Sequence, residues 1–353
     1  MPDPFDRPAP IPAFALFALL PGLLLLAACF LGGGWIWAAL IWMGGASQIV
    51  DTVIARGFAD PDSDRDSFRA PPGTDGLSVG LAGLHFLLLI AGLTALTGSE
   101  TGSAARIALF LALGLFFGQV SNSNAHELIH RGSRLLFRLG AAVYVSLLFG
   151  HHTSAHRLVH HRHVATPLDP NSARLGESFW HFFPRAWLGS FRAGLAAERE
   201  LSRAKPGRLN PYLVWILGGA ACAALVLAVF GAAGLGWYLG LCLYAQMQLM
   251  LSDYVQHYGL QRAHRASGRY EPVGPRHSWD APHFLSSLMM VNAPRHSDHH
   301  SHPARAYPGL RLERAEEPRP MLPYSLPIMA TIATMPHLWR RVMDRRVARM
   351  REL

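Results

Sequence analysis

Apolar residues in this chain are grouped in long runs, separated by shorter polar or glycine-rich segments. Six runs approach the roughly 20 residues that a helix needs to cross the hydrocarbon core of a bilayer. They occupy residues 12–31, 35–54, 78–97, 105–124, 211–230 and 235–254. A further run, 139–150, is too short to cross, and we expect it at the membrane interface or packed inside the bundle. The pattern predicts an all-α membrane protein with six transmembrane helices.

The composition agrees with this pattern. Of the 353 residues, 50% are hydrophobic and only 16% are charged, which is too apolar for a soluble enzyme of this length. The first run lies near the N-terminus, but the preceding MPDPFDRPAP is acidic and proline-rich, and no A-x-A cleavage site follows the run. We therefore expect a retained span rather than a signal peptide, within a single integral-membrane domain over residues 1–353.

Basic residues are distributed unevenly between the segments that join the runs. The segments 32–34, 98–104 and 231–234 contain no Lys or Arg, whereas 131–210 and the C-terminal tail contain most of them. By the positive-inside rule, both termini and the histidine-rich segments 125–210 and 255–353 are expected on the cytoplasmic side of a bacterial inner membrane. The same asymmetry explains the net charge of +9 without a nucleic-acid partner.

The histidines are concentrated in a few short motifs. All but His85 and His337 lie between His126 and His302. The motifs HELIH, HRLVHH, QHYGL and RHSDHH come after predicted spans, and HELIH places two rings one helical turn apart. Neutral imidazole suits iron, copper, nickel or zinc, and nine rings are too many for one ion but enough for two. The nine are His126, His130, His156, His160, His161, His257, His296, His299 and His300.

The other histidines and the cysteines have simpler interpretations. His85 lies inside the third span, where we expect a neutral ring hydrogen-bonded to a neighbouring helix. Cys29, Cys222 and Cys242 fall within predicted spans without C-x-x-C spacing, so we expect small packing residues rather than ligands or disulfides. Most of the histidines outside the motifs are expected at the surface or interface: His151, His152, His163, His181, His264, His277, His283, His302 and His337.

At this point a resemblance becomes specific. The stretches HELIHR, VATPLDPNSARLGESFW, QHYGL, SGRYEPVGPRHSW and RHSDHHSHPARAY resemble those of the integral-membrane alkane 1-monooxygenase family, from the first span to HLWRRVMDRRV. The resemblance implies that the nine histidines bind two iron ions. It also implies that the enzyme takes up an alkane or alkyl chain that is dissolved in the membrane lipid. The enzyme would use O2 to hydroxylate the terminal methyl of this substrate to a primary alcohol. Electrons would come from a rubredoxin or ferredoxin and its NAD(P)H-dependent reductase.

Some positions depart from the family pattern or are candidates for supporting roles. Ala155 and Gln256 stand where the family generally has Glu, and His163 where Arg is common, which leaves room for an atypical substrate. Residues expected to support the ligands are Glu127, Gln256 and Asp298. Acidic electron carriers are expected to dock on Arg131, Arg134, Arg138, Arg157 and Arg162.

Other functions remain as alternatives. A lipid or fatty-acid desaturase or hydroxylase, or a xylene-type methyl monooxygenase, would share histidine clusters of this general spacing. HELIH also matches the zinc-protease motif, with Glu127 as general base, but the two additional clusters argue against it. A metal transporter is least favoured, because its ligands would lie near the bilayer midplane rather than at helix ends.

Overall fold

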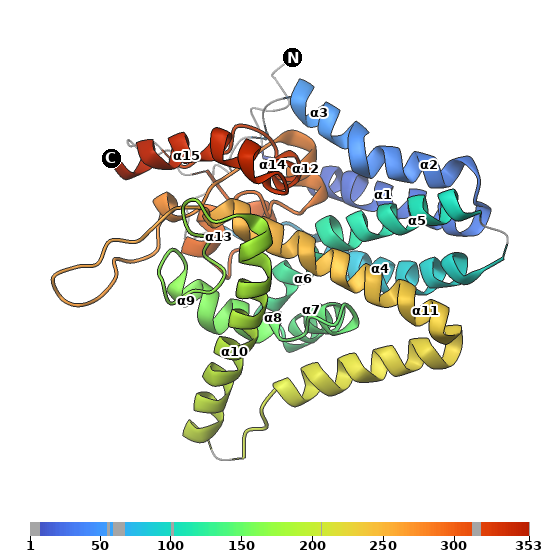
Figure 1. Cartoon of the computed structure of the whole chain (residues 1–353), viewed down its shortest axis with the longest axis horizontal. Coiled ribbons are helices and arrows are strands. Elements are labelled where there is room, and N and C mark those ends of the chain that lie inside the picture. The colour runs from blue at the N-terminus through green and yellow to red at the C-terminus, as the bar shows by residue number, and fades with distance from the viewer. Residues whose placement is uncertain are drawn as a thin grey trace.

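A computed structural model describes residues 8–54, 57–58, 68–99, 102–205, 207–312 and 319–352. Within these ranges the chain is helical and forms no strand; its only bridges are the isolated pairs His264–Tyr270 and Asp280–Met321. Long apolar helices run side by side in one part of the molecule, and shorter helices gather at one end of them (Figure 1). The predicted all-α class is confirmed.

The first two predicted spans form a helical hairpin. Helix α1 covers Ile11–Leu31, and the second helix runs from Gly34 to Val53 as α2 (Gly34–Ile41), a π-helical turn (Trp42–Ala46) and α3 (Ser47–Val53). Between them, Gly32 and Gly33 have φ of 63° and 55°, a region that glycine enters without steric cost. The reversal therefore falls within the predicted loop 32–34.

The third and fourth predicted spans are also single helices. Helix α4 covers Thr74–Thr97, and α5 (Ser103–Phe116) continues through a π-helical turn (Phe117–Ser121) into α6 (Asn122–Ile129). This 27-residue helix is long and apolar enough to cross a membrane, and its last turn contains the HELI of the first histidine motif. The apolar part of the helix therefore leads directly into the candidate site.

The fifth and sixth predicted spans are joined in α11, Tyr212–His257, which has 46 residues. The expected loop 231–234 is reduced to one non-helical residue, Gly231, with φ 67° and ψ −170°. Figure 1 shows the consequence, two arms of α11 that meet at a sharp bend. The prediction of a four-residue loop was wrong, because one glycine in the left-handed region is sufficient to reverse the chain. Among the described residues, five continuous helices are thus long and apolar enough to span a membrane.

The short run 139–150 lies inside the bundle rather than at its edge. Helix α7, Arg134–Ser146, packs against α4, α6 and α11. At its end Ser146 Oγ lies 2.8 Å from Nε2 of the buried His85 in α4, which confirms the expected hydrogen bond between helices. Cys29, Cys222 and Cys242 are free thiols within α1 and α11, as predicted.

The remaining helices form what we call the cap, made by residues 152–204, 275–312 and 319–352 at one end of the long helices (Figure 1). Apart from two longer helices at 179–204 and 336–352, its elements have eight residues or fewer, and the short elements at 156–163 and 296–301 bring several histidines to one place. The helices of the cap are α8 (His152–Ala155), a π-helical turn (His156–His160), α9 (His161–His163), α10 (Phe179–Ala204), a 3-10 turn (Pro275–His277), α12 (Phe284–Met289), α13 (His296–Ser301), a second 3-10 turn (Tyr307–Gly309), α14 (Leu326–Ala333) and α15 (Pro336–Glu352).

Candidate metal centre

The nine motif histidines come together in two groups. They arrive from four segments: the end of α6, the helical turns at 156–163, the end of α11, and α13. In each group, one ring nitrogen per histidine lies within 4.8 Å of the corresponding nitrogens of the others. The group of five is His126, His130, His156, His161 and His299, and the group of four is His160, His257, His296 and His300.

The ring nitrogens are spaced as ligands around a common centre would be. His156 Nε2 lies 2.8 Å from His126 Nε2 and 2.9 Å from His161 Nε2. In the other group, His296 Nε2 lies 3.0 Å from Nε2 of both His257 and His300. With a metal–nitrogen distance of about 2.1 Å, two ligands at right angles are separated by about 3.0 Å. The donor geometry therefore fits a metal ion in each group.

Two further nitrogens support this fit. Nε2 of His130 and Nε2 of His160 are buried and have no hydrogen-bond partner within the described part of the chain. A buried polar atom without a partner is costly, so such atoms are expected where a ligand belongs. Each group contains such an Nε2 atom, which agrees with a metal site in each group.

Burial also keeps most of these rings in the form that binds metals. His156, His299 and His300 are each at most 3% exposed. Burial lowers the pKa of all three imidazoles well below the usual histidine value, and neighbouring histidines lower it further. They are therefore neutral at physiological pH, with a lone pair available for a metal.

His160 differs because a carboxylate supports it. Burial alone would lower the pKa of His160, but Asp169, whose Oδ2 lies 2.9 Å from His160 Nδ1, raises it above the ordinary value. Asp169 also accepts hydrogen bonds from Ser172 Oγ and the Asn171 N–H, so its own position is fixed. This contact orients the ring and leaves its Nε2 for the group of four. Asp169 lies in the stretch VATPLDPNSARLGESFW, which resembles the family, but the sequence alone predicted no role for it.

Two other contacts that hold the ligand-bearing segments in place were also not predicted from the sequence. Nδ1 of His257 lies 3.2 Å from the carbonyl oxygen of His277, which accepts a hydrogen bond from the ring N–H. Asp280 accepts hydrogen bonds from the backbone N–H and the hydroxyl of Ser297, at the start of α13. His277 is 20 residues from His257, and Asp280 is 17 residues from Ser297, which adjoins the motif histidine His296, so local spacing could not reveal these contacts.

The three supporting residues expected from the sequence make different contacts. Glu127 Oε1 accepts from the Tyr307 N–H and pairs with Arg131, and Asp298 pairs with Arg305 and His302. Gln256 accepts from Ser252 Oγ at 2.8 Å and donates to the Ala293 carbonyl at 3.2 Å. These contacts tie the ligand-bearing segments to their neighbours, rather than orienting a ligand ring.

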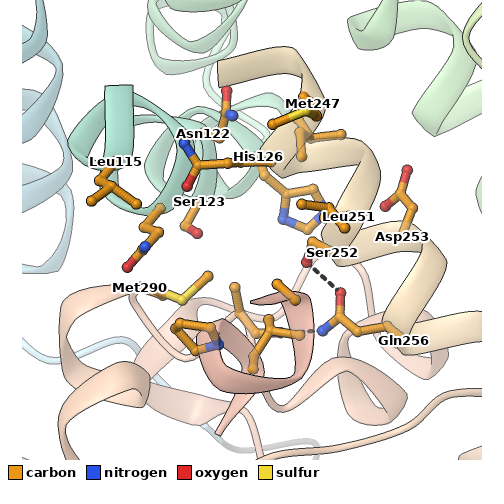
Figure 2. Close-up of a pocket in the computed structure, with 18 of the residues that line it drawn as sticks. Leu115, Asn122, Ser123, His126, Met247, Leu251, Ser252, Asp253, Gln256 and Met290 are labelled. Atoms are coloured by element: carbon orange, nitrogen blue, oxygen red, sulfur yellow. Dashed lines mark hydrogen bonds between the residues drawn. The ribbon is translucent and has the colours of Figure 1, made fainter. Parts of the chain in front are cut away.

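A cavity of about 290 Å³ ends at the two groups. His126 from the group of five and His296 from the group of four both contribute to its wall. Figure 2 shows His126 beside Leu251, with Leu115, Met247 and Met290 making apolar surface and Ser123, Ser252 and Gln256 adding polar atoms. The lining comes mainly from α5, α6, the second arm of α11, and α14. A mainly apolar molecule can therefore lie with one end beside both groups.

The histidines outside the motifs largely behave as expected, with exceptions. His163, His181, His264, His283, His302 and His337 are exposed or half-buried. His151, His152 and His277, however, are buried. The His152 ring stacks on His156 at 5.0 Å between centroids and lines the cavity. His152 belongs to no motif and was grouped with histidines expected mostly at the surface or interface; it is buried because α8 packs against α10 and the π-helical turn His156–His160.

The predicted docking arginines are mostly at the surface. Arg134, Arg138, Arg157 and Arg162 are exposed, and the Arg157 guanidinium lies 4.9 Å from the centre of the Phe137 ring. Arg131 is different, because its side chain is only 13% exposed and pairs with Asp75 at 2.8 Å and Glu127 at 3.4 Å. Arg131 thus connects the first histidine motif to α4 and does not belong to a free basic surface.

Comparisons with known proteins agree with this geometry. Residues 102–332 match the model of the fatty acid desaturase family. Alkane 1-monooxygenase 1 of Alcanivorax borkumensis is 33% identical over 329 residues, covering 89% of this chain and 79% of the relative. The chain belongs to the alkane 1-monooxygenase family. Another member, from Acinetobacter baylyi, is 29% identical over 304 residues, which is 85% of this chain and 74% of the relative. The xylene/toluene monooxygenase hydroxylase component of Pseudomonas putida is 26% identical over 331 residues, which is 88% of this chain and 82% of that protein.

One departure from the alkane 1-monooxygenase pattern has a structural counterpart. Ala155 is buried against α10, where a Cβ added to Gly194 would lie 3.1 Å from the Ala155 Cβ. On the same helix, the buried Glu198 accepts a hydrogen bond from Ser154 Oγ at 2.8 Å and pairs with Arg208. A carboxylate is therefore present beside the second histidine motif, although it comes from α10.

Proposed function

We propose that this protein is a membrane di-iron monooxygenase that hydroxylates the terminal methyl of alkanes or alkyl chains to primary alcohols. The observation that best supports the proposal is the position of the cavity, which ends at His126 of one histidine group and His296 of the other. An unactivated methyl group offers no polar handle, so an enzyme has to orient it by enclosing the rest of the chain. The cavity provides such an enclosure beside both groups.

The nine histidines are proposed to bind two irons, five around one and four around the other. Imidazole binds several transition metals, but breaking a C–H bond with O2 requires a redox-active one. When bound, the irons supply the activation of oxygen. One oxygen atom of O2 enters the C–H bond and the other leaves as water, which consumes two electrons and two protons.

The protein's own residues have the remaining tasks. Apolar side chains such as Leu115, Met247 and Met290 enclose the alkyl chain and exclude bulk water. Asp169 and the His277 carbonyl hold His160 and His257 in fixed orientations. Ser252 and Gln256 provide polar atoms on the cavity wall, where the hydroxyl of the product forms.

We propose six membrane spans, with each arm of α11 as one of them. The bend at Gly231 supports this proposal, because with both arms crossing the bilayer it would bring their other ends to the same side. The Lys- and Arg-free segments at 32–34 and 231–234 would then face the periplasm, and the cap and both termini the cytoplasm of a bacterial inner membrane.

The electrons are proposed to come from a rubredoxin or ferredoxin with an NAD(P)H-dependent reductase. The three cysteines lie within membrane helices and are free thiols, so they are not arranged to hold an iron–sulfur cluster. Because the cap is basic, an acidic carrier would be attracted to it from the cytoplasm.

The proposal is tested with protein purified in lipid nanodiscs and loaded anaerobically with ferrous iron. Octane, a medium-chain fatty acid and xylene are supplied separately with rubredoxin, its reductase and NADH, and products are identified by gas chromatography. We expect 1-octanol from octane, and no product with NADH alone. Oxidation of only the fatty acid, or of only xylene, would assign the protein to one of the related activities.

A further inference from the structure

We propose that the hairpin formed by residues 261–274 is the docking site of a small acidic one-electron carrier and leads its electrons to the histidine group of four. The inference rests on the proposed function and identifies the surface on which its electron donor binds. The hairpin leaves the end of α11 and returns to the 3-10 turn Pro275–His277. In Figure 1 it projects from the cap, away from the long helices, where a protein in solution can reach it.

The hairpin has a defined shape. The Arg265 N–H donates to the Arg269 carbonyl at 2.8 Å, and the Gly268 N–H donates to the Arg265 carbonyl at 3.0 Å. Gly268 has φ of 74°, so the tight turn at the tip suits glycine. An isolated bridge joins His264 to Tyr270. Its tip therefore presents Arg265 and Arg269 together at the surface, where both are exposed.

The charge of the hairpin is strongly positive. Between residues 261 and 276 the chain contains four arginines and one carboxylate, Glu271. Glu271 Oε1 is already engaged by the Ala263 N–H at 2.8 Å and by His277 Nε2 at 3.0 Å. Arg265 and Arg269 thus offer two guanidinium groups at the tip to an acidic partner.

Neighbouring basic residues enlarge this surface. Arg262, at the base of the hairpin, donates from Nη1 to the Arg162 carbonyl at 3.1 Å and from its N–H to the Ala165 carbonyl at 2.8 Å. The exposed Arg162 therefore borders the hairpin. On the other side, Arg351 of α15 donates to the Gly259 carbonyl at 2.7 Å. Three exposed arginines of α15, at positions 341, 345 and 349, lie on one face of that helix, and Arg340 and Arg351 are exposed as well.

The base of the hairpin is also connected to the metal centre. Glu271 holds the His277 ring at 3.0 Å, and the His277 carbonyl accepts from His257 Nδ1 at 3.2 Å. His257 Nε2 in turn faces His296 within the group of four. Two hydrogen bonds, both made by His277, thus connect the Glu271 side chain of the hairpin to His257, a proposed iron ligand. Arg134 and Arg138, by contrast, belong to α7, which packs among the long helices α4, α6 and α11.

The electron count is simple. Each reduced carrier gives one electron and leaves oxidised, so two carriers must dock in succession for each alcohol formed. A docking site that is used twice per turnover benefits from fast, charge-steered association rather than from tight binding. Exposed arginines on a projecting hairpin meet this requirement.

The test compares two charge-reversal variants in nanodiscs of zwitterionic lipid. Arg265→Glu/Arg269→Glu changes the hairpin, and Arg134→Glu/Arg138→Glu changes the same number of exposed arginines on α7, which belong to the docking surface expected from the sequence, so the two variants compare the two surfaces. The measurements are the KM for a bacterial rubredoxin at low and high salt, the iron content, and octane hydroxylation driven by dithionite without a carrier. Arg265→Lys/Arg269→Lys keeps the charge and serves as the conservative variant.

We expect the hairpin reversal to raise the KM for rubredoxin about tenfold or more and to remove most of its salt dependence. Iron content and dithionite-driven hydroxylation should stay unchanged, the Lys variant should be near native, and the α7 variant should change the KM less than about twofold. An unchanged KM in the hairpin variant, or an equal increase in the α7 variant, would overturn the docking site alone. A native protein that takes no electrons from rubredoxin or ferredoxin would instead overturn the proposed donor.

Discussion

Oδ2 of Asp169 lies 2.9 Å from Nδ1 of His160, and both side chains are buried. This pair joins the loop after the second histidine motif to the group of four, and the carboxylate fixes which ring nitrogen faces the group. Carboxylate–histidine contacts of this kind support metal ligands by fixing the tautomer and the orientation of the ring.

Asp169→Asn should weaken iron binding at the group of four. The amide keeps the size of the side chain but loses the negative charge, so we expect a loss of about 10- to 100-fold in iron affinity or turnover. Competition with a chelator measures the affinity. The control is Asp344→Asn, which changes a carboxylate that is hydrogen-bonded to Tyr258 instead of to a motif histidine. Native iron affinity in Asp169→Asn would show that the contact does not support a ligand.

Single histidine variants should separate the two groups. His299 and His300 are neighbours on α13 but belong to the group of five and the group of four, respectively. We expect His299→Ala or His130→Ala to deplete one site and His300→Ala the other, each leaving about one iron per chain and abolishing hydroxylation. Elemental analysis and Mössbauer spectroscopy measure the remaining iron.

The control for these variants is His337→Ala, an exposed histidine on α15, which should keep both irons and full activity. A motif variant that keeps two irons and native turnover would remove that histidine from the ligand set. One zinc ion per native chain, with no iron, would contradict the whole mechanism.

Gln256→Glu should leave the iron content unchanged. Gln256 hydrogen-bonds to Ser252 and to the Ala293 carbonyl, and a glutamate keeps only the first contact because an ionised carboxylate cannot donate. We expect the rate of octane oxidation to change by no more than about 10- to 100-fold. If only the glutamate variant holds two irons or turns over, the native chain is an impaired relative of the alkane hydroxylases.

Glu177→Gln should destabilise the protein in a pH-dependent manner. Burial would raise the pKa of Glu177, but hydrogen bonds from Arg185 at 2.7 and 2.9 Å and from the Arg174 N–H lower it below its ordinary value. A depressed pKa in the folded state means that the ionised carboxylate stabilises the fold above the unfolded-state pKa. This contribution is lost as the pH falls through the folded-state value.

The melting temperature of Glu177→Gln should therefore lie a few degrees below that of the native protein at pH 7. The difference should shrink below about pH 4, as the native carboxyl takes up its proton. Differential scanning fluorimetry in detergent measures both. Glu200→Gln, an exposed position on α10, is the control and should show no such difference. If the difference in melting temperature stays constant down to low pH, the ion pair of Glu177 with Arg185 is not its cause.

Reporter fusions test the proposed topology. Fusions after residues 33 and 233 should be active as periplasmic reporters, and fusions after residues 190 and 350 as cytoplasmic ones, because Lys and Arg are concentrated on the cap side. Equal reporter activity at 190 and 233 would mean that the first arm of α11 does not cross the membrane. A periplasmic reporter at 350 would contradict the orientation as a whole.

The long helices and the nine clustered histidines could be predicted from the sequence, because both depend on local properties. An apolar run long enough to cross a bilayer is helical wherever it lies, since only a helix satisfies its backbone hydrogen bonds in lipid. The helices α1, α4 and α5 with α6 therefore begin and end within a few residues of the predictions. Likewise, the i and i+4 spacing of His126 and His130 already placed both rings on one face of a helix.

The division of those histidines into two groups was decided only by the tertiary structure. His160 and His161 are adjacent in the chain but enter different groups, because neighbouring helical residues point about 100° apart and each meets rings from other segments. Asp280 and the His277 carbonyl support the site, and Arg131 pairs with Asp75, through contacts between residues 17 to 56 positions apart in sequence. Asp169 supports His160 across nine positions, through the fold of the loop between them. Such contacts depend on how the helices pack against one another, and no local pattern of residue types specifies that packing.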